Sequence, residues 1–290
     1  MTARFREGRH VRFHRPIDPL LEALLDSYRE WGGTASPPMM AIVDWRGVPT
    51  WTEFEILRDA FIERGVSTIV CDPRDLEFDG RALTVEGRKI DLVYRRVLIN
   101  DMIAQPDECA ALVRAYETRA VCVANTLRCK IAHKKAFFAV LTDPANSAMF
   151  SPAERDVIAA SVPWTRLLNA PLMDTARARR ERLVLKPNDE YGGKGVTLGW
   201  EADEGSWDAA LQAAASDAPG SWVIQERIPV RREVFPQFDT NGDVTMREML
   251  VDLAPYLFRG KMTGYLTRLS ATGLANVTSG GGQVPSFILD

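Results

Sequence analysis

Residues 183–200 read LVLKPNDEYGGKGVTLGW and place two lysines on either side of a glycine-rich turn. Leu183–Leu185 is an apolar run that predicts a short buried strand, and residues 196–200 predict its partner strand. Tyr191-Gly192-Gly193 predicts a mobile connection, because glycine lets the backbone approach a ligand closely. Lys186 and Lys194 would then present positive charges to an anion, and a polyphosphate is the anion we expect.

A plain hairpin with a Gly-Gly turn and a surface lysine would also explain this stretch. Two other phosphate-binding motifs are excluded. A P-loop needs a glycine at the position of Asn188 and a Ser or Thr at the position of Gly195. A dinucleotide fingerprint needs its glycines to open a helix, whereas these glycines precede a strand. The interpretation of the loop therefore depends on support from other segments.

The composition is that of a globular protein. The 290 residues are 46% hydrophobic and 26% charged, which allows one large core or two modest ones. The net charge of -3 argues against nucleic acid as a main partner. Arginines between residues 4 and 15 form the one basic region, which is either a solvated tail or an electrostatic contact. No run of 18 apolar residues occurs, so we expect no membrane span and a cytoplasmic location.

The cysteines and histidines carry no recognisable site. Because no Cys-x-x-Cys spacing occurs, we expect reduced, buried thiols and neither disulfides nor zinc at Cys71, Cys109, Cys122 and Cys129. His133 is the only histidine besides His10 and His14. The chain therefore offers few histidines that could act as the general base of a Ser-His-Asp mechanism.

Short apolar runs alternate with helices in the first half of the chain, which predicts an α/β layer with a parallel sheet. The expected helices cover residues 19–31, 51–64 and 106–117, and the expected strands cover residues 40–43, 67–71, 91–94 and 120–123. Loops at the carboxyl ends of such strands tend to carry function, which draws attention to Asp44, Asp72, Arg95 and Arg96.

The second half predicts an α+β region with an antiparallel sheet. A helix is expected to begin at Asn125 or Thr126, and Ser151, Pro152 and Glu154 predict a capping box that starts another. Strands are expected at 183–187, 195–200, 222–226, 244–252 and 256–269, with a helix at 207–215. We therefore divide the chain into a basic lead with one helix (1–38), an α/β domain (39–125) and a ligand-binding region (126–290).

Two further segments accompany the glycine-rich loop. The strand WVIQERI, residues 222–228, ends in Gln225-Glu226, and an extended segment of this kind suits adenine recognition, although it also suits an ordinary strand end. Arg268 follows an apolar strand, Asn276 comes eight residues later, and Gly280–Gly282 could hold an anion. A guanidinium suits a phosphate or carboxylate, and a surface salt bridge is the alternative role of Arg268.

In combination, these segments resemble the ATP-grasp superfamily, and specifically the circularly permuted ATP-grasp proteins related to glutathionylspermidine synthase. The resemblance is carried over residues 39–290 by VLKPNDEYGGKGV, WVIQERI, RLSATGLANVTSGGG, AHKKAFFAVLTD and IDLVYRRV. It implies a parallel-sheet layer followed by an ATP-grasp fold of antiparallel sheets with helices. It also implies an ATP- and Mg2+-dependent carboxylate-amine ligase that works through an acylphosphate, with small-molecule or peptide carboxylates and amines as substrates.

The resemblance also assigns roles around the nucleotide. Lys186 would contact the α- and β-phosphates, and Lys135 or Lys134 would approach the nucleotide from the other side. The lid over the phosphates would be formed by Gly192, Gly193 and Lys194.

At the other end of the nucleotide, the adenine site would be lined by Gln225, Glu226 and Ile228. Glu226 or Glu233 would lie near the amino group or the ribose. Arg268 and Asn276 would face the transferred phosphoryl group or the substrate carboxylate.

The magnesium ligands are the weak point of the resemblance. The permuted family would place an Arg-x-Asp strand and a Glu-x-Asn pair upstream of the α/β layer, and no such pair precedes Gly32. Glu248 and Asp252 lie on one face of a predicted strand and are possible substitutes, with a structural salt bridge as the alternative. We therefore expect a shortened form that binds nucleotide and turns it over weakly or not at all.

Two rival functions stay open at this point. The chain could be a nucleotide-binding or scaffold protein without turnover, or a module in which the lysines recognise only a glycan or peptide carboxylate. The sequence does not determine the substrates or the oligomeric state.

Overall fold

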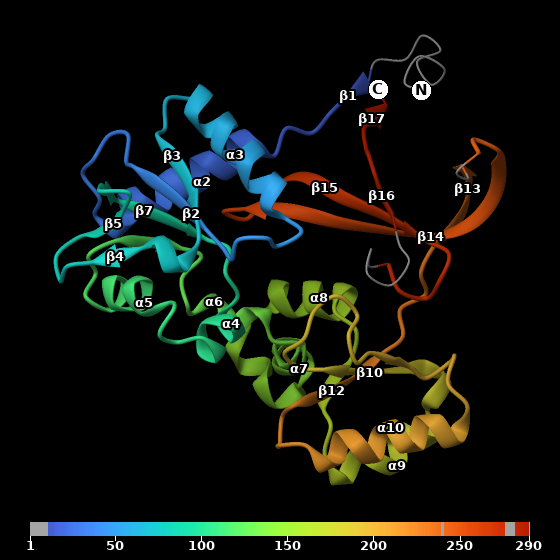
Figure 1. Cartoon of the computed structure of the whole chain (residues 1–290). Coiled ribbons are helices and arrows are strands. Elements are labelled where there is room, and N and C mark those ends of the chain that lie inside the picture. The colour runs from blue at the N-terminus through green and yellow to red at the C-terminus, as the bar shows by residue number, and fades with distance from the viewer. Residues whose placement is uncertain (1–10, 239–240, 276–281, 290) are drawn as a thin grey trace. The chain divides into compact units, whose positions relative to one another are not determined.

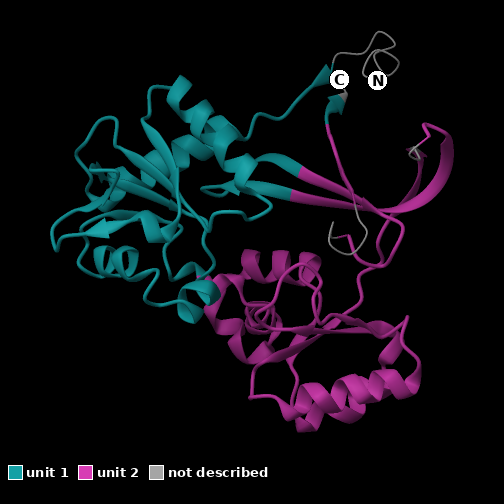
Figure 2. Ribbon diagram, in the orientation of Figure 1, with its two compact units in different colours: residues 1–129, 255–265, 287–290 teal, residues 130–254, 266–286 magenta. Residues whose placement is uncertain are grey.

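The computed structural model describes residues 11–238, 241–275 and 282–289 (Figure 1). The chain divides into two compact units (Figure 2). Unit 1 contains Met1–Cys129, Pro255–Tyr265 and Phe287–Asp290, and unit 2 contains Lys130–Ala254 and Leu266–Ser286. The outer end of the hairpin formed by β14 (Val244–Phe258) and β15 (Lys261–Ser270) is thus counted with unit 1.

Unit 1 is built on the expected parallel sheet, with strand order β3-β2-β7-β8. Its strands are β2 (Met40–Val43), β3 (Thr68–Cys71), β7 (Leu92–Arg95) and β8 (Cys122–Ala124). All residues of β2 and β7 are buried, because helices cover both faces of a parallel sheet. The short, continuous apolar runs of these strands are the sequence signal for that environment.

Alternation along β2 separates two cores. Ala41 and Val43 pack in the core that includes Leu112 of α5 (Ala110–Glu117). Met40 and Ile42 pack on the opposite face, in a core shared with α2 (Ile17–Trp31) and α3 (Trp51–Glu63). Helix α2, which we assigned to the separate lead 1–38, therefore shares a hydrophobic core with the sheet of unit 1.

Two details of unit 1 differ from the sequence prediction. The helix expected at 106–117 begins later, as α5, and a helix that we did not predict, α4 (Ile99–Ala104), precedes it, with a break after α4 at Gln105 (φ -130°, ψ 63°). The break precedes Pro106, which disfavours helical backbone at the residue before it. A small antiparallel sheet that we did not predict lies between β3 and β7 in the chain and comprises β4 (Glu77–Phe78), β5 (Leu83–Val85) and β6 (Arg88–Ile90).

The cysteine prediction is partly wrong. Cys71, Cys109 and Cys122 are buried free thiols, and burial raises the pKa of Cys71 to about 12. Cys129 is a free thiol but is exposed, because it lies at the start of the short helix α6 (Cys129–His133), which buries none of its residues.

Unit 2 contains two antiparallel four-stranded sheets. The first has the order β11-β10-β12-β9, with β9 (Thr165–Leu167), β10 (Leu183–Pro187), β11 (Thr197–Leu198) and β12 (Trp222–Glu226). The second has the order β13-β14-β15-β16, with β13 (Arg232–Phe238) and β16 (Gly282–Val284) at its edges. The expected fold class, a parallel-sheet layer followed by antiparallel sheets with helices, is confirmed.

The helices of unit 2 follow the local capping signals in one place and not in another. Ser151 and Glu154 form the predicted capping box, with Ser151 Oγ accepting from Glu154 N at 3.3 Å, and helix α8 (Pro152–Ser161) begins there. The single helix expected from residue 125 is instead split into α6 and α7 (Ala136–Thr142). The N–H group of Ala136 donates to Asn188 Oδ1 at 2.8 Å, so a residue distant in sequence fixes where α7 begins.

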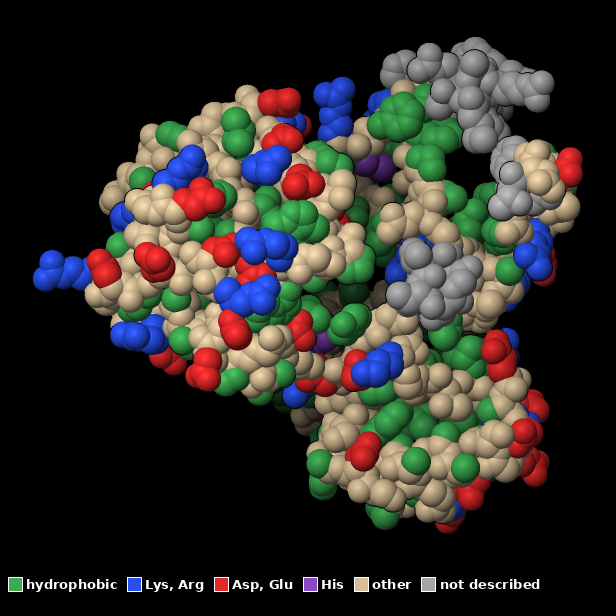
Figure 3. Space-filling view, in the orientation of Figure 1, with side chains coloured by type: hydrophobic (Ala, Val, Ile, Leu, Met, Phe, Trp, Pro, Cys, Tyr) green, Lys and Arg blue, Asp and Glu red, His purple; other side chains and the backbone are tan. Residues whose placement is uncertain are grey.

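Within the described residues, no helix is both long enough and apolar enough to cross a lipid bilayer. On the face shown in Figure 3, Lys and Arg side chains are interspersed with Asp and Glu side chains.

Candidate functional site

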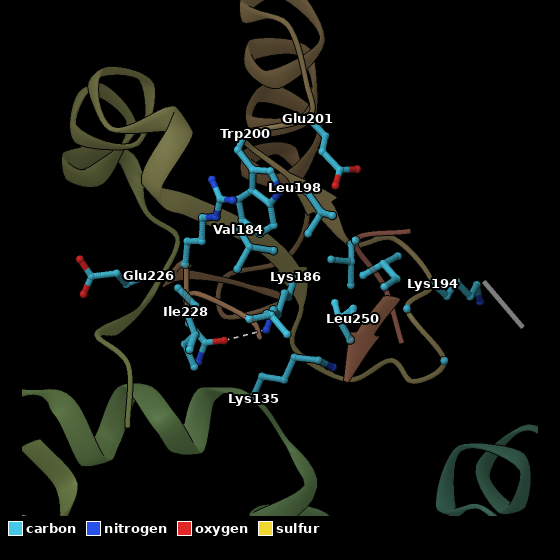
Figure 4. Close-up of a pocket in the computed structure, with 18 of the residues that line it drawn as sticks. Lys135, Val184, Lys186, Lys194, Leu198, Trp200, Glu201, Glu226, Ile228 and Leu250 are labelled. Carbon is cyan, nitrogen blue, oxygen red and sulfur yellow. Dashed lines mark hydrogen bonds between the residues drawn. The ribbon is translucent and has the colours of Figure 1, made fainter. Parts of the chain in front are cut away.

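A pocket of about 480 Å³ lies in unit 2 beside the glycine-rich loop (Figure 4). Alternation along β10 explains which side chains line it. Leu183 and Leu185 point into the hydrophobic core with Trp207 of α10 (Glu204–Ser216), whereas Val184 and Lys186 line the pocket. Strand β12 places Gln225 opposite Val184 in the antiparallel register, on the same face. The volume is in the range of small-molecule sites.

Lys186 is the electrostatic centre of the pocket. Its Nζ donates to Gln225 Oε1 at 2.7 Å, and no carboxylate pairs with this ammonium among the described residues (Figure 4). Burial, followed by the charge of Lys135, lowers the pKa of Lys186. A half-buried ammonium with a neutral partner and a second lysine nearby is a site that an anion would stabilise.

A buried hydrogen-bond chain holds Gln225 in place. Its Nε2 donates to Thr165 Oγ1 at 2.9 Å, and Thr165 Oγ1 donates to Pro163 O at 2.9 Å. Both Gln225 and Thr165 are buried. The orientation of the Gln225 amide, with its oxygen toward Lys186, is therefore fixed by the strand on its far side.

Lys135 contributes the second cation. Its Nζ donates to Glu190 O at 2.6 Å, and its backbone N–H donates to Asn188 O at 3.1 Å. Burial lowers the pKa of this lysine as well. Its neighbour Lys134 does not line the pocket and lies 3.7 Å from Asp189 Oδ2. Of the two lysines that we considered for this role, the structure places Lys135 at the pocket.

The loop of residues 188–194 has the backbone shape that its glycines predict. Gly192 and Gly193 have φ angles of +68° and +79°, in the left-handed region that glycine adopts without steric penalty. Lys194 is exposed and forms an i,i+4 ion pair with Glu190 at 3.1 Å. In Figure 4 its side chain extends away from Lys135 and Lys186.

Asp189 ties the loop to the segment that precedes α7. Its Oδ1 lies 2.5 Å from Lys130 Nζ and 3.7 Å from His133 Nε2. Burial acts to raise the pKa of Asp189, but the hydrogen bond from Lys130 and the charges of the surrounding lysines lower it overall. The loop is thus held by a carboxylate in a lysine-rich environment.

The part of the pocket away from the lysines is apolar. Its main apolar side chains are Val184, Leu198, Trp200, Ile228 and Leu250, of which Leu250 comes from β14 of the second sheet. The guanidinium of Arg227 lies 4.4 Å from the centroid of the Trp200 ring. This combination of apolar walls and a cationic end suits a ligand with a flat apolar part and an anionic tail.

Glu226 lines the pocket, but its carboxylate is already paired. Glu226 Oε1 lies 3.2 Å from Arg179 Nη2, and Figure 4 shows the side chain directed away from Lys186. The backbone of residues 226–228 is therefore the part of this segment that best suits contact with a ligand. Ile228 lines the pocket and is largely exposed.

Four other predicted site residues lie outside this pocket, and Asn276 lies outside the described residues. Glu233 is on β13, where its carboxylate pairs with Arg231 at 2.6 Å. Arg268 donates through Nε and Nη2 to Asp252 Oδ2, at 2.7 and 2.6 Å. Glu248 is exposed on β14. The structure thus brings Arg268 and Asp252 together and brings neither Glu233 nor Glu248 to the lysines.

These contacts bear on the expected magnesium site. Asp252 is neutralised by Arg268, and a cation would have to compete with that guanidinium. Among residues 11–238, 241–275 and 282–289, no group of three or more His, Cys, Asp or Glu side chains is placed to hold a metal ion. Glu248 and Asp252 therefore do not fit a magnesium site within the described part of the chain.

Sequence reasoning missed several lining residues, among them Leu198, Trp200, Glu201, Leu250 and Leu274. Trp200 and Glu201 come two and three residues after the end of β11, so their position after the second strand of the hairpin was a usable signal. Leu250 and Leu274 come from the second sheet and from the turn after β15, and no local pattern links them to β10.

The comparisons with known proteins agree with this architecture. The model of the circularly permuted ATP-grasp type 2 family matches residues 9–277. A Frankia alni protein, provisionally named glutamate–cysteine ligase 2-3, is 26% identical over 212 residues, which cover 69% of this chain and 24% of that protein. An uncharacterized protein of Mycobacterium bovis is 25% identical over 295 residues, which cover 95% of this chain and 51% of that protein. The chain thus spans between about a quarter and about half of these relatives.

A solved structure of a D-cycloserine synthetase is 16% identical, has a TM-score of 0.46 and matches 86% of this chain and 75% of that chain. The family model alone covers most of the sequence and includes the β10 and β12 segments that form the pocket. The chain belongs to the circularly permuted ATP-grasp type 2 family.

Proposed function

We propose that the pocket of unit 2 binds ATP and that the chain provides the nucleotide-binding part of a carboxylate-amine ligase. The observation that carries this proposal is the half-buried ammonium of Lys186, which has a neutral hydrogen-bond partner and a second lysine nearby. An uncompensated charge of this kind is costly in the free protein and favours a bound anion.

The shape of the pocket suggests the orientation of the nucleotide. The triphosphate would lie at the end formed by Lys135, Lys186 and the 188–194 loop, and the adenine would pack between Val184 and Leu250. The edge of the base would face the backbone of residues 226–228, after the end of β12. The loop would close over the phosphates, which would exclude water from the reacting groups.

The proposed reaction has two steps. A substrate carboxylate oxygen attacks the γ-phosphorus, the bond to the β-phosphate oxygen breaks, and ADP leaves. The amine then attacks the carbonyl carbon of the acylphosphate, inorganic phosphate leaves, and the amine nitrogen loses a proton. The role of the chain is to position and neutralise the phosphates through its lysines, since such a transfer needs no protein nucleophile.

Several parts of this assignment stay predictions. These are the roles of Arg268 and Asn276 at the transferred phosphoryl group, Glu233 at the nucleotide, the identity of both substrates, the cytoplasmic location and the narrower relationship to glutathionylspermidine synthase. ATP-grasp ligases use Mg2+, and the two carboxylates considered for it, Glu248 and Asp252, do not fit such an ion. The expectation of a shortened form likewise stays a prediction.

A second candidate function is nucleotide binding without turnover. The specific observation that favours it is the ion pair between Arg268 and Asp252. Asp252 is one of the two carboxylates considered as metal ligands, and it is already neutralised by this guanidinium. In that case the chain would bind ATP with the same lysines and release no phosphate.

Thermal unfolding with and without ATP tests the shared nucleotide site. We expect ATP to raise the melting temperature of the parent protein, because a ligand that binds only the folded state stabilises it. Lys186→Met should remove most of the shift, whereas Lys261→Met, at an exposed lysine of β15, should keep it. A parent protein without a shift would refute the nucleotide site.

Phosphate release in the presence of Mg2+, a carboxylate and an amine then separates the two candidates. Release above the rate of the Lys186→Met variant supports the ligase. ATP binding without release by this chain supports the second candidate.

A further inference from the structure

The parallel sheet of unit 1 has a topological switch point. The chain runs from β2 outward to β3, and then returns to place β7 on the other side of β2, which gives the order β3-β2-β7-β8. Ligands of open α/β sheets bind outside the carboxyl ends of the strands, at the point where the strand order reverses. In this sheet that point lies between β2 and β7 (Figure 1).

The residues that follow these two strands are Asp44 and Arg96. Val43 is the register partner of Arg95, so Asp44 and Arg96 are the next residues along two hydrogen-bonded parallel strands. The backbone N–H groups of Arg96 and Val97 both donate to Val43 O, at 2.8 and 2.9 Å, which fixes the two strand ends against each other. Asp44 and Arg96 thereby occupy neighbouring positions at the carboxyl edge of the sheet.

Asp44 is a buried carboxylate with spare capacity to accept hydrogen bonds. Asp44 as a whole residue is 8% exposed, and its Oδ1 accepts from Trp45 N at 2.8 Å. Within the described residues this carboxylate forms no ion pair, although a carboxylate can accept about four hydrogen bonds. Burial raises the pKa of Asp44, as expected for a carboxyl group that lacks a close counter-charge.

Arg96 is a rigid cation that is only weakly neutralised. Its guanidinium carbon lies 5.0 Å from the Phe54 ring centroid and 5.6 Å from the Tyr94 ring centroid, and Nη1 donates to Tyr94 Oη at 3.0 Å. Glu53, its ion-pair partner, is 3.4 Å away with a half-exposed side chain, and such exposed pairs contribute little. The fork of N–H donors can therefore still bind a carboxylate.

Asp72 follows the neighbouring strand β3 and is a purely structural carboxylate that differs from Asp44 in its hydrogen bonds. Its side chain is fully buried, and its oxygens accept from Arg74 Nε and Nη2 at 2.7 Å each and from the backbone N–H of Arg46 at 2.7 Å. Asp72 is therefore saturated by its own surroundings, whereas Asp44 is not.

We propose that this edge of unit 1 binds a small zwitterion of the amino-acid type, with its ammonium group on Asp44 and its carboxylate on Arg96. An amino acid carries an ammonium and a carboxylate on one α-carbon, and these two charges complement the carboxylate and the guanidinium at the two adjacent strand ends. The role of such a ligand as the substrate of a ligase rests on the proposed function, but its binding does not.

Calorimetric titration and thermal unfolding of the nucleotide-free protein test the proposal. The probes are the proteinogenic L-amino acids, each compared with its deaminated carboxylic acid and its decarboxylated amine. We expect at least one amino acid to bind and to raise the melting temperature, with both truncated analogues weaker by about tenfold or more, since each loses a charged hydrogen-bonded contact.

Substitutions then locate the site. Asp44→Asn and Arg96→Gln should each weaken binding of that amino acid by about tenfold or more. Glu77→Gln and Arg88→Gln remove the same charges from exposed positions of the small sheet in unit 1 and should leave binding intact. The panel on the parent protein needs no variant, so the test does not depend on whether the substituted chains fold.

Absence of binding by every amino acid of the panel overturns the proposal, as does binding that both Asp44→Asn and Arg96→Gln leave unchanged. Equal binding of the decarboxylated amine also overturns it, because Arg96 would then have no role. The ATP-dependent melting shift of the parent protein reports separately on the proposed function. A preparation that ATP stabilises and no amino acid binds would refute the zwitterion site alone.

Discussion

Replacing Lys186 with methionine removes the ammonium from the pocket and keeps an unbranched side chain of nearly the same length. In the free protein two effects oppose each other. The variant no longer desolvates an ammonium, but Gln225 Oε1 loses the donor that lies 2.7 Å away. A buried acceptor left without a partner costs about 1–3 kcal/mol, and relief from desolvation offsets part of that cost. We therefore expect the free energy of unfolding without ligand to change by no more than about 1 kcal/mol.

The effect on ATP binding should be much larger. A hydrogen bond to a charged group contributes about 1.5–3 kcal/mol, which corresponds to a dissociation constant about 10 to 150 times higher in the variant. At an ATP concentration of 100 times the parent's dissociation constant, ATP stabilises the parent by about 2.7 kcal/mol. At the same concentration the variant should gain only about 0.3–1.4 kcal/mol.

Urea denaturation with and without ATP measures both quantities on the same protein. Lys261→Met is the matched control, because it makes the same substitution at an exposed lysine. If Lys186→Met keeps the full ATP-dependent stabilisation of the parent, Lys186 does not contact the phosphates. If the variant loses several kcal/mol of stability without ligand, Lys186 is primarily a structural residue.

Three further predictions address the loop, the lysines and Asn188. Hydrogen exchange of the amides in residues 188–194 should slow when ATP is added, because the loop closes over the phosphates; equal exchange in both states would contradict a lid. Burial lowers the pKa of Lys135 and Lys186 below their ordinary value of 10.5, so the folded chain releases these protons at lower pH than the unfolded chain does. Raising the pH from the lowered pKa values of these two lysines toward 10.5 should therefore increase the stability of the ligand-free protein, measured by thermal unfolding. The same change of pH should weaken ATP binding, measured by titration calorimetry. An ATP affinity that is constant across this pH range would show that neither ammonium is needed. Asn188→Ala should lower the free energy of unfolding by about 2–4 kcal/mol in urea denaturation, because two backbone groups lose their buried partners. The control is Asn146→Ala, at a partly exposed asparagine that also donates to a backbone carbonyl. An equal loss in both variants would refute the special role of Asn188.

The structural reason for the Asn188 prediction is that this one residue joins three segments. Its Oδ1 accepts from Ala136 N and its Nδ2 donates to Gly220 O, both at 2.8 Å. Its backbone N–H donates to Ser221 O at 2.7 Å. Loss of the side chain would therefore loosen the start of α7, which follows Lys135, as well as the turn before β12.

Local pattern was sufficient for most of the fold. Short, mainly apolar runs identified the strands of the parallel sheet, because a strand covered on both faces is predominantly apolar. The apolar run Leu183–Leu185 identified β10, and the Ser151–Glu154 capping box marked the start of α8. These features depend on neighbours within a few residues, so the sequence alone contains the information that decides them.

The errors arose where distant residues decide the outcome. The helix expected from residue 125 is divided because Asn188, more than 50 positions away, supplies the hydrogen bonds at the start of α7. Asp252 and Glu248 are four residues apart on β14, yet Arg268 of the neighbouring strand β15 forms an ion pair with Asp252. No periodicity along β14 reveals which side chain of β15 lies beside it.

The candidate sites divide in the same way. The sequence by itself determined the glycine-rich loop, the lysine that follows the apolar run of β10 and the polar residues that follow the parallel strands. Only the tertiary structure placed Lys135 and not Lys134 at the pocket, turned Glu226 toward Arg179, and brought Leu250 of the second sheet into the same pocket as Val184. It also set Asp44 beside Arg96, through the register of β2 with β7. Backbone propensity and hydrophobic alternation act over a few residues, whereas charge pairing and pocket shape depend on strand order and register, which are fixed only when the chain has packed.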